Sequence, residues 1–488
     1  MIQIDLLIIS LFLLITLIIG IYYGRGVKTF QEYAVGSRKI STTVLVLSLI
    51  ATIYGGGNLS TRLDVSYRKG LCALLLDLTA PMNLYISMRF IIVRMKEFIG
   101  HYSIAESMGS IYGKWVRMAT ALFGIIMCIG FFAIQVKVGL TIITTLFPEM
   151  KDLSTHATLF TTLLIIGYAT FGGAKSVALT DVYQFLLFGL CFPILVFIFL
   201  YHAKNPIDGW HKLMKLPQFN PTKISQWNDM LKGILACFIW RPLLLSLDPA
   251  RIQRFYMASS TQQAERIFSR TAIIRTIIPL LFLIVAIALH VGGHEIPKSQ
   301  NVLYYIIELT YFPGIRGMLV TVIFALLMST ADSYLHAASV LFTGDLWPVL
   351  TSTVNHVSKP TLRVVRIVSV CMGMLGFWIA YYATHISQIF NKLVNPYLPI
   401  VTMPFIMTVL GFRPRAAALL GSMGINSSIL LYRIYYKGES LSEKQLFILF
   451  MLSALMLLTF HYLLPKRPHT GWVGIPDSSA WDLQNQIT

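Results

Sequence analysis

Charged residues are scarce in this sequence, and acidic ones are the scarcest. Of 488 residues, 12% are charged and only 21 are Asp or Glu, whereas 56% are hydrophobic. A soluble domain carries about 25% charged residues, so the composition excludes a chain built mainly of soluble domains. Apolar runs of about 20 residues, each long enough to cross the hydrocarbon core of a bilayer, recur along nearly the whole length. The sequence predicts an all-α polytopic membrane protein.

Cysteines and enzyme motifs are also few. The five cysteines lie in apolar runs without the spacing of a metal site, so we expect packed free thiols rather than disulfides or zinc. No nucleophile–base pair, HExxH sequence or correctly spaced phosphate loop is present, so we expect neither an enzyme nor an organic cofactor. The formal charge of +18 lies in short loops that orient membrane spans, so we expect a lipid bilayer and no nucleic acid as partner.

Thirteen apolar runs bounded by Gly, Pro and charged residues are predicted to be spans. Odd-numbered connections carry more Lys and Arg than even-numbered ones, which predicts an N-terminus outside and a C-terminus in the cytoplasm. The first run has no basic segment before it and no small-residue cleavage site, so we expect it to remain as a span. The predicted spans lie near 4–23, 43–66, 71–93, 116–147, 157–173, 176–201, 229–248, 271–291, 314–346, 362–383, 387–410, 415–434 and 445–464.

Two groups of five spans have opposite predicted topology, which is the arrangement of a five-plus-five inverted-repeat transporter. The first helix of each group contains residues that break helices: three glycines in one, and Pro242 and Pro249 in the other. Paired irregular helices point to a binding site near the membrane midplane. The predicted organisation is a peripheral helix and cytoplasmic loop at 1–40, a first repeat at 41–201, an extracellular loop at 202–228, a second repeat at 229–410, two peripheral helices at 411–464 and a cytoplasmic tail at 465–488.

The glycines at 55–57 lie near the middle of the second predicted span. Each makes the helical state about 1 kcal/mol less favourable than alanine would, so we expect the helix to break there. Backbone groups freed by a break are tolerated in a membrane only when they are buried in protein or line a wet cavity. The break is therefore a candidate binding site, with a close crossing of two helices as the alternative.

The ninth predicted span carries unusually many polar residues. On a helix, Leu326, Ser329, Thr330 and Ser333 fall on one face, and Asp332 lies at its edge. Hydroxyls with a free carbonyl suit a small hard cation, whereas the alternative is that Ser and Thr bond to carbonyls of their own helix. Asp181 is a further intramembrane carboxylate, which marks an ion or proton route or a structural ion pair. Asp77, Lys137 and Arg241 are candidate members of such pairs.

Four segments in this order resemble the sodium:solute symporter family: FQEYAVGSRKISTTVLVLSLIAT, FGGAKSVALTDVYQ, IQRFYMASSTQQAERIF and ALLMSTADSYLHAASVLFTGDLW. The resemblance covers about residues 4–464 and implies an inverted-repeat fold with a sodium ion between the broken helix and the ninth span. Carried across residue by residue, it implies that the carbonyls of Ala51, Tyr54 and Leu326 and the hydroxyls of Ser329 and Thr330 bind this ion. Some relatives imply a second sodium site near the cytoplasmic exit, which here would use Asp181, Ser329, Asp332 and Ser333.

The substrate side departs from the family pattern. Ile53 stands in the broken segment where many relatives have a polar residue, and Arg241 stands where a substrate-facing aromatic is common. Arginine can bind a carboxylate bidentately, which favours a carboxylate-bearing solute, unless Arg241 is neutralised by Asp248 or another buried acid. The remaining substrate-binding candidates are Asn58, Gln135, Lys137 and Trp240.

We therefore expect sodium-driven symport of a small organic solute, such as an amino acid or a monocarboxylate, by alternating access in a monomer. One alternative is proton coupling through Asp181 and Asp332. Another is a sensor with a transporter fold that does not transport; such a protein normally needs an output domain, and the predicted tail after Leu464 leaves no room for one.

Overall fold

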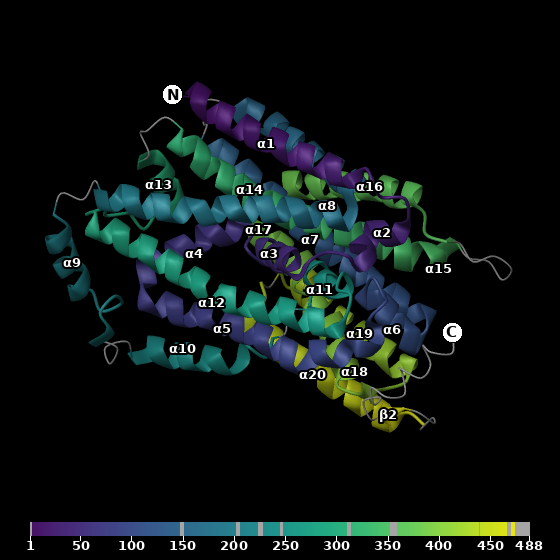
Figure 1. Cartoon of the computed structure of the whole chain (residues 1–488). Coiled ribbons are helices and arrows are strands. Elements are labelled where there is room, and N and C mark those ends of the chain that lie inside the picture. Colours follow the sequence, from purple (N-terminus) through teal and green to yellow (C-terminus); the bar gives the residue numbers. More distant parts are fainter. Residues whose placement is uncertain are drawn as a thin grey trace.

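The computed structural model describes residues 2–146, 151–201, 205–222, 228–244, 247–309, 314–351, 359–438, 440–465 and 470–473. This part of the chain is almost entirely helical, and its long helices run side by side (Figure 1). Its two short strands, β1 (Phe412–Arg413) and β2 (Gly471–Trp472), pair antiparallel. The predicted all-α architecture is confirmed.

The helices fall into long membrane-length rods and shorter connecting pieces. Their bounds are α1 Ile2–Gly24, α2 Phe30–Val35, α3 Thr42–Ile53, α4 Gly56–Lys69, α5 Leu71–Ile86, α6 Ile104–Tyr112, α7 Lys114–Leu146, α8 Lys151–Tyr201, α9 Pro206–Lys215, α10 Asn228–Trp240, α11 Pro249–Tyr256, α12 Thr261–Val291, α13 Val302–Leu309, α14 Ile315–Leu341, α15 Trp347–Thr351, α16 Leu362–Tyr382, α17 Ile386–Ile389, α18 Met403–Val409, α19 Ala416–Leu431 and α20 Glu443–Leu463. Short 3-10 or π turns follow α2 (Gly36–Arg38), α5 (Ser87–Ile91, Ile92–Phe98), α14 (Phe342–Leu346), α17 (Phe390–Val394, Leu398–Thr402) and α19 (Tyr432–Tyr436).

Helix α14 forms the centre of the molecule. It packs against α7 and α8 more extensively than any other pair of elements packs together, and its residues from Leu319 to Leu341 are all buried. A helix that is buried all round has no water to satisfy its polar side chains, so its hydroxyls and carboxylate must bond to protein groups or bind a ligand. The polar residues of the ninth predicted span therefore lie inside the protein core.

The expected number of thirteen spans is not confirmed, and neither is the inverted repeat. Within the described residues, nine helices are long and apolar enough to cross a membrane, or ten if the bent pair formed by 30–38 and 42–53 is one span. The difference arises because some expected spans are interrupted. The run at 229–248 is the 13-residue helix α10 followed by a turn, and the run at 387–410 is divided between α17, π turns and α18.

Helix α8 contains two expected spans in one assigned element. Its 51 residues would measure about 77 Å as a straight helix, more than twice the thickness of the hydrocarbon core. Gly173 interrupts it with a φ of 62°, a conformation that favours glycine. A Cβ at this position would also lie 3.0 Å from the Cα and carbonyl oxygen of Tyr33. The interruption falls between the runs predicted at 157–173 and 176–201.

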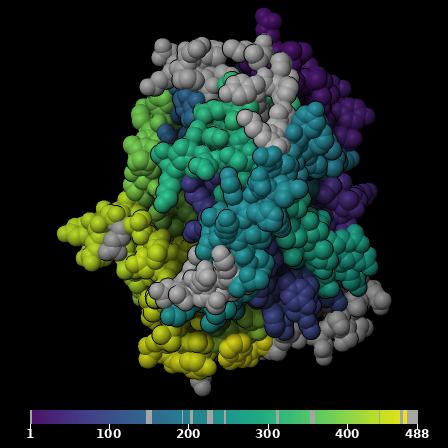
Figure 2. Space-filling view, turned by 90° about the vertical axis from the view of Figure 1, so that its left-hand side faces the viewer, coloured from purple at the N-terminus to yellow at the C-terminus, as the bar shows by residue number. Residues whose placement is uncertain are grey.

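Two expected regions are only partly described. Residues 202–204 and 223–227 of the predicted extracellular loop lie outside the described residues, and the part between them contains α9. Most of the predicted tail at 465–488 also lies outside them. Helices α9 and α13 lie at the same end of the molecule as the start of α1, and Figure 2 faces this end.

Candidate functional site

The second predicted span is broken where its glycines predict a break. Helix α3 ends at Ile53 and α4 begins at Gly56, with Tyr54 at ψ 74° and Gly55 at ψ 164° between them. These angles turn the peptide groups away from the helical direction. The side-chain amide of Asn58 donates to the carbonyl oxygen of Ile53 at 2.9 Å, which satisfies one of the acceptors that the break releases.

The broken helix lies directly against the polar face of α14. The hydroxyl of Ser329 donates to the carbonyl oxygens of Ala51 at 3.2 Å and Leu326 at 3.1 Å. The hydroxyl of Thr330 donates to the carbonyl oxygen of Thr52 at 3.3 Å, and all these residues are buried. Hydroxyl oxygens carry lone pairs and rotatable protons, so the same oxygens can turn toward a cation. A hard monovalent cation prefers oxygen ligands, so Ala51, Leu326, Ser329 and Thr330 fit the expected sodium site. Thr330 bonds to the carbonyl of Thr52, which was not among the expected ligands, and the part of Tyr54 stays a prediction.

Two of the four residues expected to hold a second sodium ion, Asp181 and Ser333, come together around a side chain that the sequence did not single out. The guanidinium of Arg254, on α11, lies 2.9 Å from a carboxylate oxygen of Asp181. It also donates to the hydroxyls of Ser48, Thr52 and Ser333 at 2.7–3.1 Å. The guanidinium thus occupies Oδ2 of Asp181 and the hydroxyl of Ser333, whereas Oδ1 of Asp181 has no hydrogen-bond partner among the described residues. A cationic side chain in this position repels a second cation, so the donor set at Asp181 and Ser333 does not fit a second sodium ion.

Asp332 borders the Arg254 cluster from the other side. The hydroxyl of Tyr168 donates to its Oδ2 at 2.8 Å, and that of Thr180 lies 3.5 Å away. Its Oδ1 has no hydrogen-bond partner in the part of the chain that the structure describes. Two carboxylates and one guanidinium are therefore buried together on the α3 side of the break.

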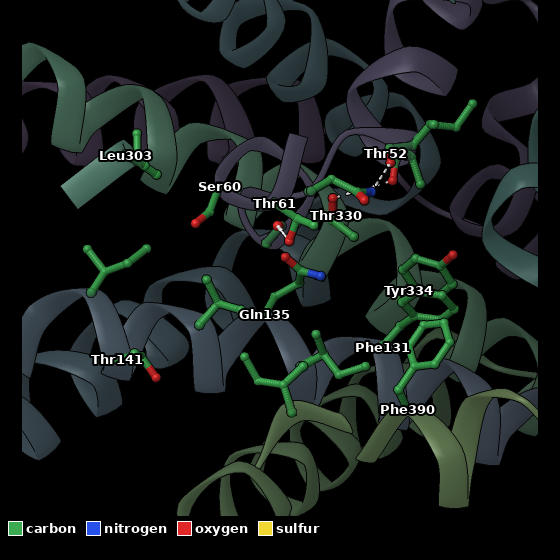
Figure 3. A pocket seen from close by; sticks show the side chains of 18 of the residues that line it. Thr52, Ser60, Thr61, Phe131, Gln135, Thr141, Leu303, Thr330, Tyr334 and Phe390 are labelled. Atoms are coloured by element: carbon green, nitrogen blue, oxygen red, sulfur yellow. Dashed lines mark hydrogen bonds between the residues drawn. The ribbon is translucent and has the colours of Figure 1, made fainter. Parts of the chain in front are cut away.

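A cavity of about 340 Å³ lies on the other side of the break. It is lined by the residues that begin α4 and by parts of α7, α11, α13, α14 and α17. In Figure 3, Gln135 lies at its centre, beneath Thr61 and Thr330, and the rings of Phe131, Tyr334 and Phe390 form one end. The rings of Phe131 and Tyr334 stack with their centroids 4.3 Å apart. The cavity therefore combines a polar middle with aromatic and aliphatic walls.

Three of the six expected substrate-binding residues line this cavity: Ile53, Asn58 and Gln135. Lys137 does not, because two residues along a helix turn a side chain to nearly the opposite face from Gln135. Trp240 lies against Phe447, with ring centroids 6.2 Å apart. Arg241 forms two 3.0 Å hydrogen bonds with Glu443 at the start of α20.

The ion pairs differ from those considered for the sequence. Asp248 pairs with Arg251, with Nε and Oδ2 2.9 Å apart, and so does not neutralise Arg241. Asp77 pairs with Arg62. Arg251 and Arg254 follow the predicted span at 229–248 and so belong to the basic residues expected in a connection, yet α11 carries the first to the cavity and the second to Asp181. Asp181 on α8 and Asp332 on α14 are intramembrane acids, and such acids indicate that a basic residue is buried beside them. Nothing in the sequence identified Arg254 as that residue.

Known proteins resemble this chain in sequence and in fold. The family model for the sodium:solute symporter family matches residues 33–423. A sodium/proline symporter of Staphylococcus aureus (strain Newman) is 22% identical over 352 residues, covering 70% of this chain and 68% of the relative. The structure of a Na+-coupled sialic acid symporter in a substrate-bound outward-open state aligns with a TM-score of 0.78 at 19% identity, over 94% of this chain and 97% of that one. A structure of MhsT in complex with L-phenylalanine aligns with a TM-score of 0.53 at 16% identity, over 87% and 98% of the two chains.

Proposed function

Because the chain belongs to the sodium:solute symporter family, we propose that it is a secondary active transporter that carries a small organic solute together with sodium by alternating access. The observation that carries this proposal is the contact between the broken helix and α14, where the hydroxyls of Ser329 and Thr330 donate to the backbone carbonyls of Ala51 and Thr52 at 3.2 and 3.3 Å. The cavity beside this contact is the candidate solute site.

The coupling ion in this proposal is held by oxygens from two elements. Ala51 and Tyr54 would contribute carbonyls from the end of α3, and Leu326, Ser329 and Thr330 would contribute a carbonyl and two hydroxyls from α14. An ion bound between two elements favours the conformation in which they are close. Gly55 and Thr330 also line the solute cavity, so sodium binding would order part of the wall that the solute contacts.

We propose that one sodium ion moves in each cycle. The support is Arg254, whose guanidinium bonds to Oδ2 of Asp181 and the hydroxyl of Ser333 and so places a positive charge where a second ion would bind. One charge that crosses 100 mV supplies about 2.3 kcal/mol. At about 1.4 kcal/mol for each tenfold change, this drives roughly fiftyfold accumulation before any sodium gradient is added.

The proposed orientation has the N-terminus outside, the C-terminus in the cytoplasm and two inverted repeats in a functional monomer. With this orientation, α3 begins at the cytoplasmic side and α4 ends outside. The cavity, lined by the start of α4 and by α13, then lies toward the outside. The Arg254 cluster, which joins α3, α8, α11 and α14, lies toward the cytoplasm and would have to open for release.

Transport into proteoliposomes tests this function. The purified chain is reconstituted, and uptake of labelled amino acids, monocarboxylates and sugars is measured with an inward sodium gradient at fixed pH, and with a pH gradient at fixed sodium. We expect uptake of one solute class to follow the sodium gradient. Uptake that follows only the pH gradient would instead support proton coupling through Asp181 and Asp332, and uptake that follows neither gradient would contradict symport.

A further inference from the structure

Among the described residues that line the solute cavity, one side chain is cationic, Arg251 of α11. Its Nε lies 2.9 Å from Oδ2 of Asp248, and the hydroxyl of Tyr334 donates to the other oxygen of that carboxylate at 3.2 Å. A guanidinium has five N–H donors arranged as a fork, more than these neighbours can use. The Arg251 side chain is 18% exposed and lines the cavity. Arg251 is thus held in place from one side, with donors left for a ligand.

The cavity also contains a buried acceptor, Gln135 of α7. This residue is 6% exposed, and its Oε1 has no hydrogen-bond partner among the described residues. An unsatisfied buried acceptor costs about 1–3 kcal/mol, which a ligand N–H would recover. The amide lies so close to the break that a Cβ at Gly55 would be 2.9 Å from Oε1 and 3.0 Å from the hydroxyl of Thr330.

Helices α7 and α14 place the aromatic pair Phe131 and Tyr334 about one turn from the polar pair Gln135 and Thr330. On α7, Gln135 follows Phe131 by four residues, and on α14, Thr330 precedes Tyr334 by four residues. Four residues of helix rise about 6 Å. Figure 3 shows the stacked pair Phe131 and Tyr334 at one end of the cavity and Gln135 with Thr330 beside it. Because Tyr334 bonds to Asp248, the Arg251 ion pair belongs to the aromatic end.

We propose that Arg251 binds the carboxylate and Gln135 the amino or imino N–H of a small α-amino or α-imino acid, which is the transported solute. This assignment rests on the proposed function and names the solute class for it. The carboxylate of such a solute would accept a hydrogen bond of about 2.9 Å from Arg251, and its adjacent N–H would donate one of similar length to Gln135. The aliphatic walls, which include Ile53, Val138 and Leu303, receive a hydrocarbon side chain or ring. The volume lies at the low end of the roughly 300–1,000 Å³ of ligand pockets, as a small solute requires.

Matched probes separate the two anchors. The purified full-length chain is screened by thermal shift, with and without sodium, against L-proline, L-leucine and L-alanine, their carboxamides, the amino-free acids cyclopentanecarboxylate and 4-methylpentanoate, and D-glucose. We expect at least one amino or imino acid to bind in sodium. Its carboxamide, which lacks the negative charge, and its amino-free partner, which lacks the N–H, should each bind at least about tenfold more weakly, the loss of one charge-assisted hydrogen bond.

Variants assign each preference to a residue. Arg251→Gln should remove the preference for acid over carboxamide, and Gln135→Leu should remove the preference for the amino acid over the amino-free acid. Arg241→Gln is the matched control, because that arginine pairs with Glu443 outside the cavity. Since Arg251→Gln leaves Asp248, which is 1% exposed, without its ion partner, the charge-neutral pair Asp248→Asn with Arg251→Gln and the charge-keeping Arg251→Lys are measured beside it.

The outcomes distinguish this inference from the proposed function. An unchanged acid preference in both Arg251→Gln and the charge-neutral pair would overturn the role of Arg251. Sodium-dependent binding of D-glucose alone, or of an amino-free acid as tightly as its amino acid, would overturn the solute class and leave sodium coupling intact. Amino acid binding that needs Arg251 but not sodium would support this inference and contradict the proposed function.

Discussion

Removal of the Arg254 guanidinium should destabilise the protein strongly. The group bonds to Ser48, Thr52, Asp181 and Ser333, and none of these side chains is more than 2% exposed. Arg254→Gln would leave the carboxylate of Asp181 without its ion partner in the core. Breaking a buried ion pair from one side costs about 3–5 kcal/mol, whereas replacing both partners by neutral groups is often close to neutral.

The assay is thermal unfolding of the purified protein in sodium-free detergent solution. We expect Arg254→Gln to lower the unfolding temperature by about 3–5 °C, and Asp181→Asn with Arg254→Gln to recover most of that loss. Arg241→Gln removes an arginine from a partly exposed pair, in which the Glu443 side chain is 58% exposed, so its loss should cost at most about 1 kcal/mol. A single variant no less stable than this control, or a double variant no more stable than the single one, would refute the buried pair.

Sodium gives the same experiment a second outcome. Once the guanidinium is gone, the oxygens of Asp181, Ser48 and Ser333 are available to a cation, so sodium should stabilise Arg254→Gln more than it stabilises the parent protein. An equal effect of sodium on both proteins would mean that Arg254 does not occupy a cation site.

Two further predictions concern packing around α14. Gly56→Ala should cost about 1–3 kcal/mol by overpacking, because the new Cβ would lie 2.6 Å from Cγ of Leu327. Gly57→Ala should be tolerated, because its Cβ would meet only Val138, at 3.4 Å. Equal unfolding temperatures for the two variants would contradict the contact with Leu327. Asp5→Ala should cost about 1–3 kcal/mol, because Oδ1 of this buried aspartate accepts hydrogen bonds from the backbone N–H groups of Gly314 and Gly317 at the start of α14. Ser10→Ala, a substitution at an exposed residue of α1, is the control. Equal unfolding temperatures for the two variants would argue against these hydrogen bonds to the start of α14.

The broken helix could be predicted from the sequence because its cause is local. Three adjacent glycines disfavour helix wherever they occur, and the break lies at Tyr54 and Gly55. The polar face of α14 was readable for the same reason, since helical spacing alone puts Ser329 and Thr330 together. Their contact with the broken helix was expected only through the family resemblance.

The charged partners could not be predicted, because ion pairing depends on which helices pack together. Arg241 and Arg254 both lie near predicted span ends, and the sequence favoured the first as the midplane cation. The structure places Arg241 beside Glu443 at the start of α20, and Arg254 on the short helix α11 inside the core. Helix α11 begins at Pro249 with Asp248 as its cap, so the residues that interrupt the expected span also start the helix that carries both arginines inward.

The sodium concentration at half-maximal uptake in proteoliposomes tests the central claim most directly. Ser329→Ala with Thr330→Ala removes two of the five proposed sodium ligands, and one interaction with a charged group contributes about 1.5–3 kcal/mol. We therefore expect this concentration to rise at least about tenfold. Ser339→Ala, which removes another buried hydroxyl of α14 that bonds to Tyr33 and His336, should leave it unchanged. An unchanged sodium dependence in the double variant, with the protein folded and active, would contradict the site between α3 and α14.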